Sequence, residues 1–164
     1  MLRFAGNHSV ILDEKDRVVL PLVLRKCIDE SERENLFKDI FMVRPSDTNE
    51  CLELYPKVEY DKYIDTLEKS YLPSDKKGQA YLRFFTSRVE PVDLDRQFRF
   101  TIPEVSKSAA SLGKRLVFVG RTKKIEIWDE PKWLIWQREQ GQEREVPAPS
   151  EVLIRETTQE ARSV

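Results

Sequence analysis

The chain has 164 residues, of which 40% are hydrophobic and 35% are charged, and its net charge is −1. This composition predicts one soluble, globular domain, with neither a secretory signal at its start nor an apolar run near the roughly 20 residues that cross a bilayer. Because the chain is nearly neutral, any contact with nucleic acid must come from a local cluster of charge or from repetition in an oligomer.

The first part of the chain predicts strands separated by short helices. In chain order we expect strands over 9–13 and 17–20, a helix over 22–28 that follows a proline, and paired strands over 40–43 and 51–55. A helix is expected over 56–71, with apolar residues at helical spacing on one face: Tyr60, Tyr63, Ile64, Leu67 and Tyr71.

A connecting helix over 74–86 is expected to direct Tyr81, Phe84 and Phe85 to the core. Strands then follow over 88–94 and 99–102, a helix over 104–112 closed by Gly113, strands over 115–120 and 124–128, and a helix over 129–140 with Asp129 as its N-cap. The charged remainder, with its Pro-Ala-Pro break, has the composition of a disordered tail.

The chain contains two related halves. Residues 11–21 read ILDEKDRVVLP and residues 93–103 read DLDRQFRFTIP, so that three residues recur 82 positions later: Asp13 as Asp95, Arg17 as Arg99 and Pro21 as Pro103. A second pair, 52–55 and 125–128, recurs at an offset of 73. Two matches in the same order indicate an internal repeat, with a longer connection in the first half over the polar stretch 29–39.

This repeat divides the chain into four parts. Residues 1–72 are expected to form the first repeat with its terminal helix, 73–86 the connecting helix, 87–137 the second repeat with its terminal helix, and 138–164 the tail.

Residues that carry catalysis or bind metals are scarce. His8 is the only histidine, while Cys27 and Cys51 lack metal-ligand spacing and are expected to be buried, reduced thiols. The sequence has no phosphate-binding glycine loop, nucleophile elbow or zinc motif. We therefore expect no catalytic residue, no metal site, no cofactor, no small-molecule substrate and no enzyme activity.

The two turns resemble the signatures of the MraZ family, in which Asp-x-Lys-Gly-Arg precedes an apolar strand and a proline, and Asp-x-x-Gly-Arg recurs in the second half. Residues 13–17 read DEKDR and residues 95–99 read DRQFR. Further matches lie at 54–56, 82–85, 117–120 and 126–133, so the resemblance spans residues 4–136.

The resemblance implies an α+β fold, a double-split β-barrel made of two swapped-hairpin, AbrB-like (SpoVT-AbrB) repeats with decorating helices. It further implies a cytoplasmic, nucleoid-associated transcriptional regulator, commonly a repressor. Family members form ring-like homo-oligomers and bind direct repeats in double-stranded DNA upstream of their own operon, the cell-division and cell-wall gene cluster.

The sequence departs from the family where each signature has glycine, because Asp16 and Phe98 stand there. Glycine at such a turn supplies a positive φ, which aspartate tolerates moderately and phenylalanine poorly. We therefore expect the first turn to be rebuilt mildly and the second more strongly. Residues 13–17 also sum to a charge of −1, which opposes approach to phosphate.

An arginine after a tight turn, repeated in two halves, suits DNA recognition, because arginine binds guanine or phosphate through two hydrogen bonds. We rank Arg17 first as a DNA-binding residue, then Lys15, and then Arg99 and Arg96 of the second turn. Asp13 and Asp95 are expected to orient the turns by bonding to backbone amides.

Other interpretations stay open. An Asp-x-x-x-Arg pair across a hairpin is often only a surface or interface ion pair. The chain could also be an oligomeric protein-interaction scaffold that has lost or altered DNA binding, and an enzyme or an AbrB-type antitoxin are remoter alternatives. The basic residues Arg121, Lys123 and Lys124 fit an exposed hairpin tip better than a phosphate contact.

Overall fold

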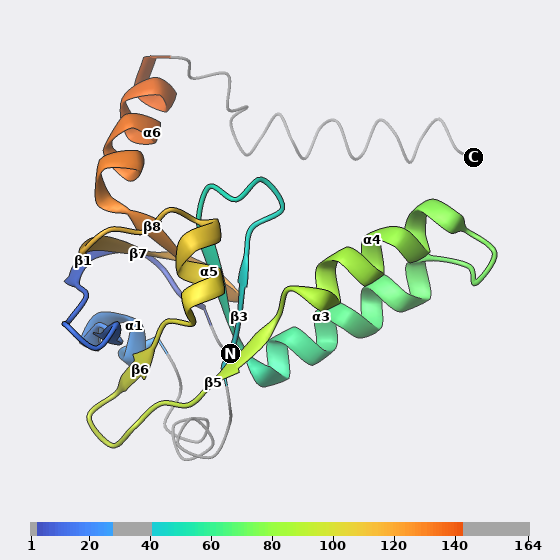
Figure 1. Cartoon of the computed structure of the whole chain (residues 1–164), viewed down its shortest axis with the longest axis horizontal. Coiled ribbons are helices and arrows are strands. Elements are labelled where there is room, and N and C mark those ends of the chain that lie inside the picture. The colour runs from blue at the N-terminus through green and yellow to red at the C-terminus, as the bar shows by residue number, and fades with distance from the viewer. Residues whose placement is uncertain (1–2, 28–40, 143–164) are drawn as a thin grey trace. The chain divides into compact units, whose positions relative to one another are not determined.

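The computed structural model describes residues 3–27 and 41–142 (Figure 1). The chain divides into two compact units after Trp133, and every strand of the described residues lies in the first unit. Among the described residues, no helix has the length and apolar character to span a membrane.

The first unit is built on a six-stranded antiparallel sheet. Its order is β1 (Asn7–Ile11), β7 (Arg115–Arg121), β8 (Lys124–Asp129), β4 (Leu52–Pro56), β3 (Phe41–Pro45) and β5 (Glu90–Val92). A separate antiparallel pair joins β2 (Arg17–Val19) to β6 (Arg99–Thr101). The predicted α+β class is confirmed, and the eight expected strands are present with shifted ends.

The two halves interlock through their strands. The first strand of each half pairs with the third strand of the other, as β1 with β7 and β5 with β3. At the centre of the sheet, β4 pairs with β8 so that Glu53 lies opposite Glu126, and in the small pair Val18 lies opposite Phe100. These opposed residues are repeat equivalents, at offsets of 73 and 82, so the pairings follow a pseudo-twofold relation between the halves.

Short helices follow the small strands. Helix α1 (Leu22–Lys26) begins after Pro21 and helix α5 (Glu104–Ala109) after Pro103, where the fixed φ of proline suits helix entry. The expected closure of the second helix by Gly113 is wrong, because Ser111 adopts the left-handed conformation, with φ of 52°. The chain has already left the helix at Gly113, whose amide donates to Asp129 Oδ1 instead.

Two longer helices, α3 (Lys57–Ser70) and α4 (Lys76–Ser87), lie side by side (Figure 1). The ring of Phe85 joins them by contacting Tyr60 and Tyr63 of α3. The prediction that Phe84 faces the core is wrong, because its side chain is 42% exposed and lies under the Arg88 guanidinium. Adjacent helical residues point about 100° apart, and Phe85 takes the buried position.

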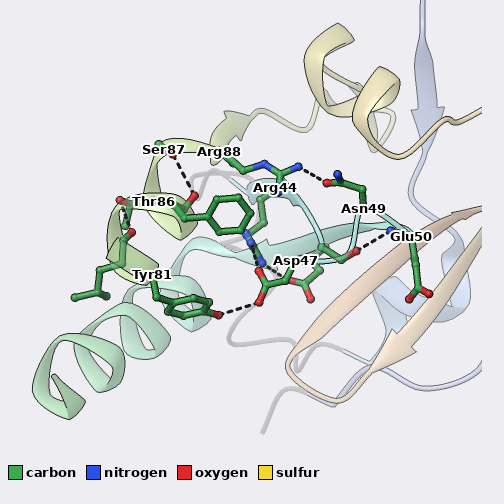
Figure 2. A network of polar contacts seen from close by, with 12 residues as sticks. Arg44, Asp47, Asn49, Glu50, Tyr81, Thr86, Ser87 and Arg88 are labelled. Atoms are coloured by element: carbon green, nitrogen blue, oxygen red, sulfur yellow. Dashed lines mark hydrogen bonds and ion pairs between the residues drawn. The ribbon is translucent and has the colours of Figure 1, made fainter. Parts of the chain in front are cut away.

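A polar network attaches α4 to the loop between β3 and β4 (Figure 2). Arg44, only 2% exposed, donates from Nη2 to Asp47 Oδ1 at 2.5 Å and from Nη1 to Glu53 Oε2 at 2.8 Å. The Tyr81 hydroxyl donates to Asp47 Oδ2 at 3.0 Å, and the Arg44 guanidinium lies 3.9 Å from the centre of the Phe85 ring. A buried arginine thus holds strand, loop and helix together.

A smaller apolar cluster contains Cys51, Trp128 and Trp133. Burial raises the pKa of the Cys51 thiol to about 12, so it stays protonated and unreactive. Cys27 is only half-buried, contrary to expectation, because it directly follows the short helix α1. Helix α6 (Glu130–Gln142) extends two residues past its predicted end, so the first five residues of the predicted tail, 138–142, are helical. The rest of the predicted tail, from 143, and the predicted connection at 29–39 lie outside the described residues.

Candidate nucleic-acid interface

The pair β2–β6, called the ribbon below, separates its residues into two faces. Val18 and Phe100 point inward and are each 2% exposed. The residues on either side of them alternate to the outer face, as strand geometry requires: Arg17, Val19, Arg99 and Thr101. The structure therefore brings the two turn arginines onto one outward face, with about a third of each side chain exposed.

The first turn is organised by one carboxylate. Asp13 Oδ1 accepts hydrogen bonds from the backbone amides of Lys15 and Arg17, both at 2.8 Å, and its Oδ2 accepts from Arg17 Nε at 2.7 Å. The pKa of Asp13 is lowered, first by the hydrogen bond from the Arg17 amide. Partial desolvation opposes this effect, and the Arg17 side chain adds to it. The carboxylate thus fixes both the backbone of the turn and the direction of the arginine.

The second turn has the same arrangement. Asp95 Oδ1 accepts from the amides of Gln97 at 2.8 Å and Arg99 at 2.9 Å, and Oδ2 accepts from Arg99 Nε at 2.8 Å. The pKa of Asp95 is lowered, first by the Arg99 amide. The two turns therefore have the same geometry, although their sequences, DEKDR and DRQFR, agree only at the first and last residue.

The expectation that Phe98 rebuilds the second turn is wrong. Asp16 and Phe98 both adopt the left-handed conformation, with φ of 57° and 60°. Such a conformation costs a residue with a side chain roughly 1–2 kcal/mol. At Phe98 this cost is offset, because its carbonyl accepts from the Leu20 amide at 2.8 Å and its ring packs against the core. The carbonyl of Asp16 likewise accepts from the Ile102 amide at 2.9 Å.

Each turn also receives a cation from the helix of the other half. Lys107 of α5 donates from Nζ to Asp16 Oδ1 at 2.8 Å, and the Arg25 guanidinium of α1 lies 4.1 Å from the centre of the Phe98 ring. Neither contact was expected from the sequence, since the first joins residues 91 positions apart. A signal was present nonetheless, because Arg25 and Lys107 are repeat equivalents at the offset of 82.

The remaining predicted residues, Lys15 and Arg96, are exposed within their turns. Because β2 and β6 are antiparallel, the two turns lie at opposite ends of the ribbon, Arg17 facing Thr101 at one end and Arg99 facing Val19 at the other. The structure thus brings the arginines together on one face and sets the two turns apart.

The basic residues near the tip of β7 and β8 are engaged in ion pairs. Arg121 contacts Glu126 at 2.6 Å and Lys124 contacts Glu53 at 2.6 Å. Lys123 lies 3.9 Å from Glu59. These contacts pair each cation with a carboxylate at the end of a hairpin, while Arg121 and Lys123 stay about half exposed. Within the described ranges, no group of histidine, cysteine and acidic residues could hold a metal ion.

The fold and the ribbon define an α+β protein of two interlocked half-repeats, each with an arginine-bearing turn. The sequence profile of the MraZ protein family matches the chain over residues 3–83 and again over residues 85–154. The chain belongs to the MraZ family.

Named relatives cover most of the chain. It is 34% identical to the transcriptional regulator MraZ of Tropheryma whipplei (strain TW08/27) over 137 residues, 84% of this chain and 88% of that protein. It is 31% identical to the transcriptional regulator MraZ of Lachnoclostridium phytofermentans, covering 79% of this chain and 84% of that protein. With the protein of the same name from Marinobacter nauticus, the identity is 29% over 93% of this chain and 99% of that protein.

Proposed function

We propose that this chain is a sequence-specific, DNA-binding transcriptional regulator whose DNA interface is the outer face of the ribbon. The observation that carries the proposal is the pair of arginines on that face, each oriented by its own aspartate. A two-stranded ribbon fits the major groove, where arginine distinguishes guanine through O6 and N7. The relatives named as transcriptional regulators support this assignment.

The aspartate contacts favour recognition over simple charge pairing. Each carboxylate binds the Nε of its arginine, which is one of five donors on a planar guanidinium. Binding through Nε fixes the plane of the group, while the terminal amino groups keep the geometry that suits a base edge or a phosphate. Asp13 and Asp95 therefore act as positioning residues, and Lys15 and Arg96 supply further positive charge at the turns.

We further propose that the regulator acts in the cytoplasm as a ring-like homo-oligomer on direct repeats upstream of its own operon, the division and cell-wall gene cluster, as a repressor. A net charge of −1 gives a single chain no overall attraction for DNA. Linked copies bind adjacent sites at high effective concentration, so direct repeats are the natural target. In this proposal, sheet and ribbon are the two parts of a double-split barrel.

The test measures binding to duplex DNA from upstream of the gene, beside a scrambled duplex, over a range of salt. We expect specific binding that weakens with salt, and roughly 10- to 100-fold weaker binding for Arg17→Ala and Arg99→Ala, the loss typical of a bidentate base contact. Arg83→Ala is the matched control, because it removes the same charge from an exposed position on α4. Equal losses in all three variants would contradict the proposed interface, and failure of the folded protein to bind any duplex would contradict the function.

A second function has one observation in its favour, the charge of −1 over residues 13–17. It suits an oligomeric scaffold of the same fold that binds protein partners and has lost or altered DNA binding. Replacing Asp16 and Phe98 by glycine separates the two, because the regulator should then bind DNA more tightly, whereas a scaffold should gain no affinity.

A further inference from the structure

The two ends of the ribbon share a backbone but differ in charge. Residues 13–17 contain three acidic and two basic residues, whereas residues 95–99 contain one acidic and two basic residues. The first turn is therefore −1 and the second is +1.

The helix packed against each turn enlarges this difference. Helix α5, which reaches the first turn through Lys107, contains one lysine and one glutamate and is neutral. Helix α1, which reaches the second turn through Arg25, contains one arginine and one lysine and no acidic residue. Over these turn and helix residues alone, the first end sums to −1 and the second to +3.

The two cations that cross between halves also differ in what they contact. Lys107 is bound to the Asp16 carboxylate, which raises its pKa and neutralises its charge locally. Arg25 lies over the neutral ring of Phe98, and no carboxylate within the described ranges forms an ion pair with it. The equivalent turn residues thus treat the cation of the opposite helix differently, since Asp16 neutralises Lys107 and the Phe98 ring carries no charge to neutralise Arg25.

We propose that Asp16 limits the affinity of this protein for DNA, because it occupies Lys107 and leaves the second end of the ribbon as the stronger phosphate-binding end. This inference rests on the proposed function and reverses the ranking expected from the sequence, in which Arg17 came first. The first end contributes a neutralised contact, and the second contributes most of the attraction for the DNA backbone.

A purely structural role for the Asp16–Lys107 pair makes a different prediction. If the pair only holds α5 against the turn, removing it should lower stability and loosen DNA binding. If Asp16 withholds a cation, removing its charge should tighten binding, and the gain should depend on Lys107. Asp16→Asn distinguishes the two, because asparagine keeps the size of the side chain and tolerates the positive φ.

The experiment measures affinity of the full chain for the upstream duplex and for a scrambled duplex across a salt series. We expect Asp16→Asn to bind both duplexes roughly fivefold more tightly, with a logarithmic salt dependence steeper by about 0.9, the value for one added phosphate contact. In a Lys107→Met background, Asp16→Asn should not make the salt dependence of binding steeper. Glu14→Gln is the control, because it removes the same charge from the same turn, and its small gain should be equal in both backgrounds.

The variants Arg17→Ala and Arg99→Ala locate the stronger end. We expect the larger loss of binding to the scrambled duplex, and the larger decrease in salt dependence, with Arg99→Ala. The inference is overturned if Asp16→Asn does not strengthen DNA binding, or if it strengthens binding equally in the Lys107→Met background. In either case the wild-type protein still binds DNA, and the proposed function stands. If neither the wild type nor Asp16→Asn, both folded by circular dichroism, binds any duplex at low salt, the function fails and the inference with it.

Discussion

The ribbon and the centre of the large sheet lie on the same pseudo-twofold relation, yet they place charge differently. At the centre, Glu53 and Glu126 lie opposite each other and are about 9% exposed. Glu53 accepts from Arg44, from the Tyr55 hydroxyl and from Lys124, and Glu126 accepts from Arg121 and from Trp128 Nε1.

On the ribbon, by contrast, each arginine has one carboxylate partner and remains about a third exposed. Buried charge needs several partners because desolvation is costly, so the central network is committed to the fold. The ribbon charges need no such compensation and are open to a ligand. The buried glutamates of the sheet thus have several hydrogen-bond partners each, whereas the arginines of the candidate binding face have one carboxylate partner each.

The largest predicted effect breaks the central network. Glu53→Gln should lower the free energy of unfolding by about 3 kcal/mol, because it leaves the buried Arg44 with Asp47 as its remaining acidic partner. Its repeat equivalent gives a matched control, since the partner of Glu126, Arg121, is 57% exposed and can turn to water. Glu126→Gln should therefore cost about 1 kcal/mol. Urea denaturation measures both, and equal losses would contradict the distinction.

The next effect concerns the turn that tolerates an unfavourable backbone. Phe98→Ala should lower the free energy of unfolding by about 2 kcal/mol, because it removes a half-buried ring and keeps the strain of a positive φ. Phe98→Gly removes the same ring and relieves the strain, so it should be more stable than Phe98→Ala by about 1 kcal/mol. If thermal and urea denaturation give the two variants the same stability, the backbone at this position carries no strain.

A smaller effect on stability is expected from the outer face of the ribbon. Arg17→Ala and Arg99→Ala should each change the free energy of unfolding by less than about 1 kcal/mol, because each removes a partly exposed ion pair. Their stability should therefore be nearly that of the wild type while DNA binding falls. Loss of several kcal/mol would show that these arginines belong to the fold.

The smallest effect is the acid titration of the turns. The pKa of Asp13 and Asp95 is lower in the folded protein than in the unfolded chain, so their stabilising contribution is complete above the ordinary aspartate pKa of about 3.9. It is lost as pH falls through the lowered folded value. In NMR spectra the amides of Lys15, Arg17, Gln97 and Arg99 should shift below that pH, and a midpoint at or above it would contradict the hydrogen bonds assigned here.

The parts of the fold that were predicted depend on neighbouring residues. The eight strands and the proline-led helices follow from local patterns, and the repeated motif predicts both arginine turns. The internal similarity was informative because equivalent residues occupy equivalent places, as the matched hydrogen bonds of Asp13 and Asp95 show.

The parts that were missed depend on contacts across the chain. Side chains that meet only after the halves interlock, such as Lys107 and Asp16, leave no local pattern in the sequence. The same holds for Arg44, whose buried place between Asp47, Glu53 and Phe85 follows from the packing of α4 on the sheet. Extending the 82-residue offset from the turns into the following helices would have indicated that Arg25 and Lys107 are equivalent.

The difference between Asp16 and Phe98, at equivalent turn positions, also gives the ribbon a direction. A ribbon with perfect twofold symmetry looks the same after rotation by half a turn, as does the backbone of a DNA duplex, so it could lie on a site in either direction with equal energy. Aspartate in one turn and phenylalanine in the other remove that degeneracy. If the ribbon binds DNA as proposed, each copy has a defined direction on its site, which a row of identically oriented repeats requires and a palindrome does not.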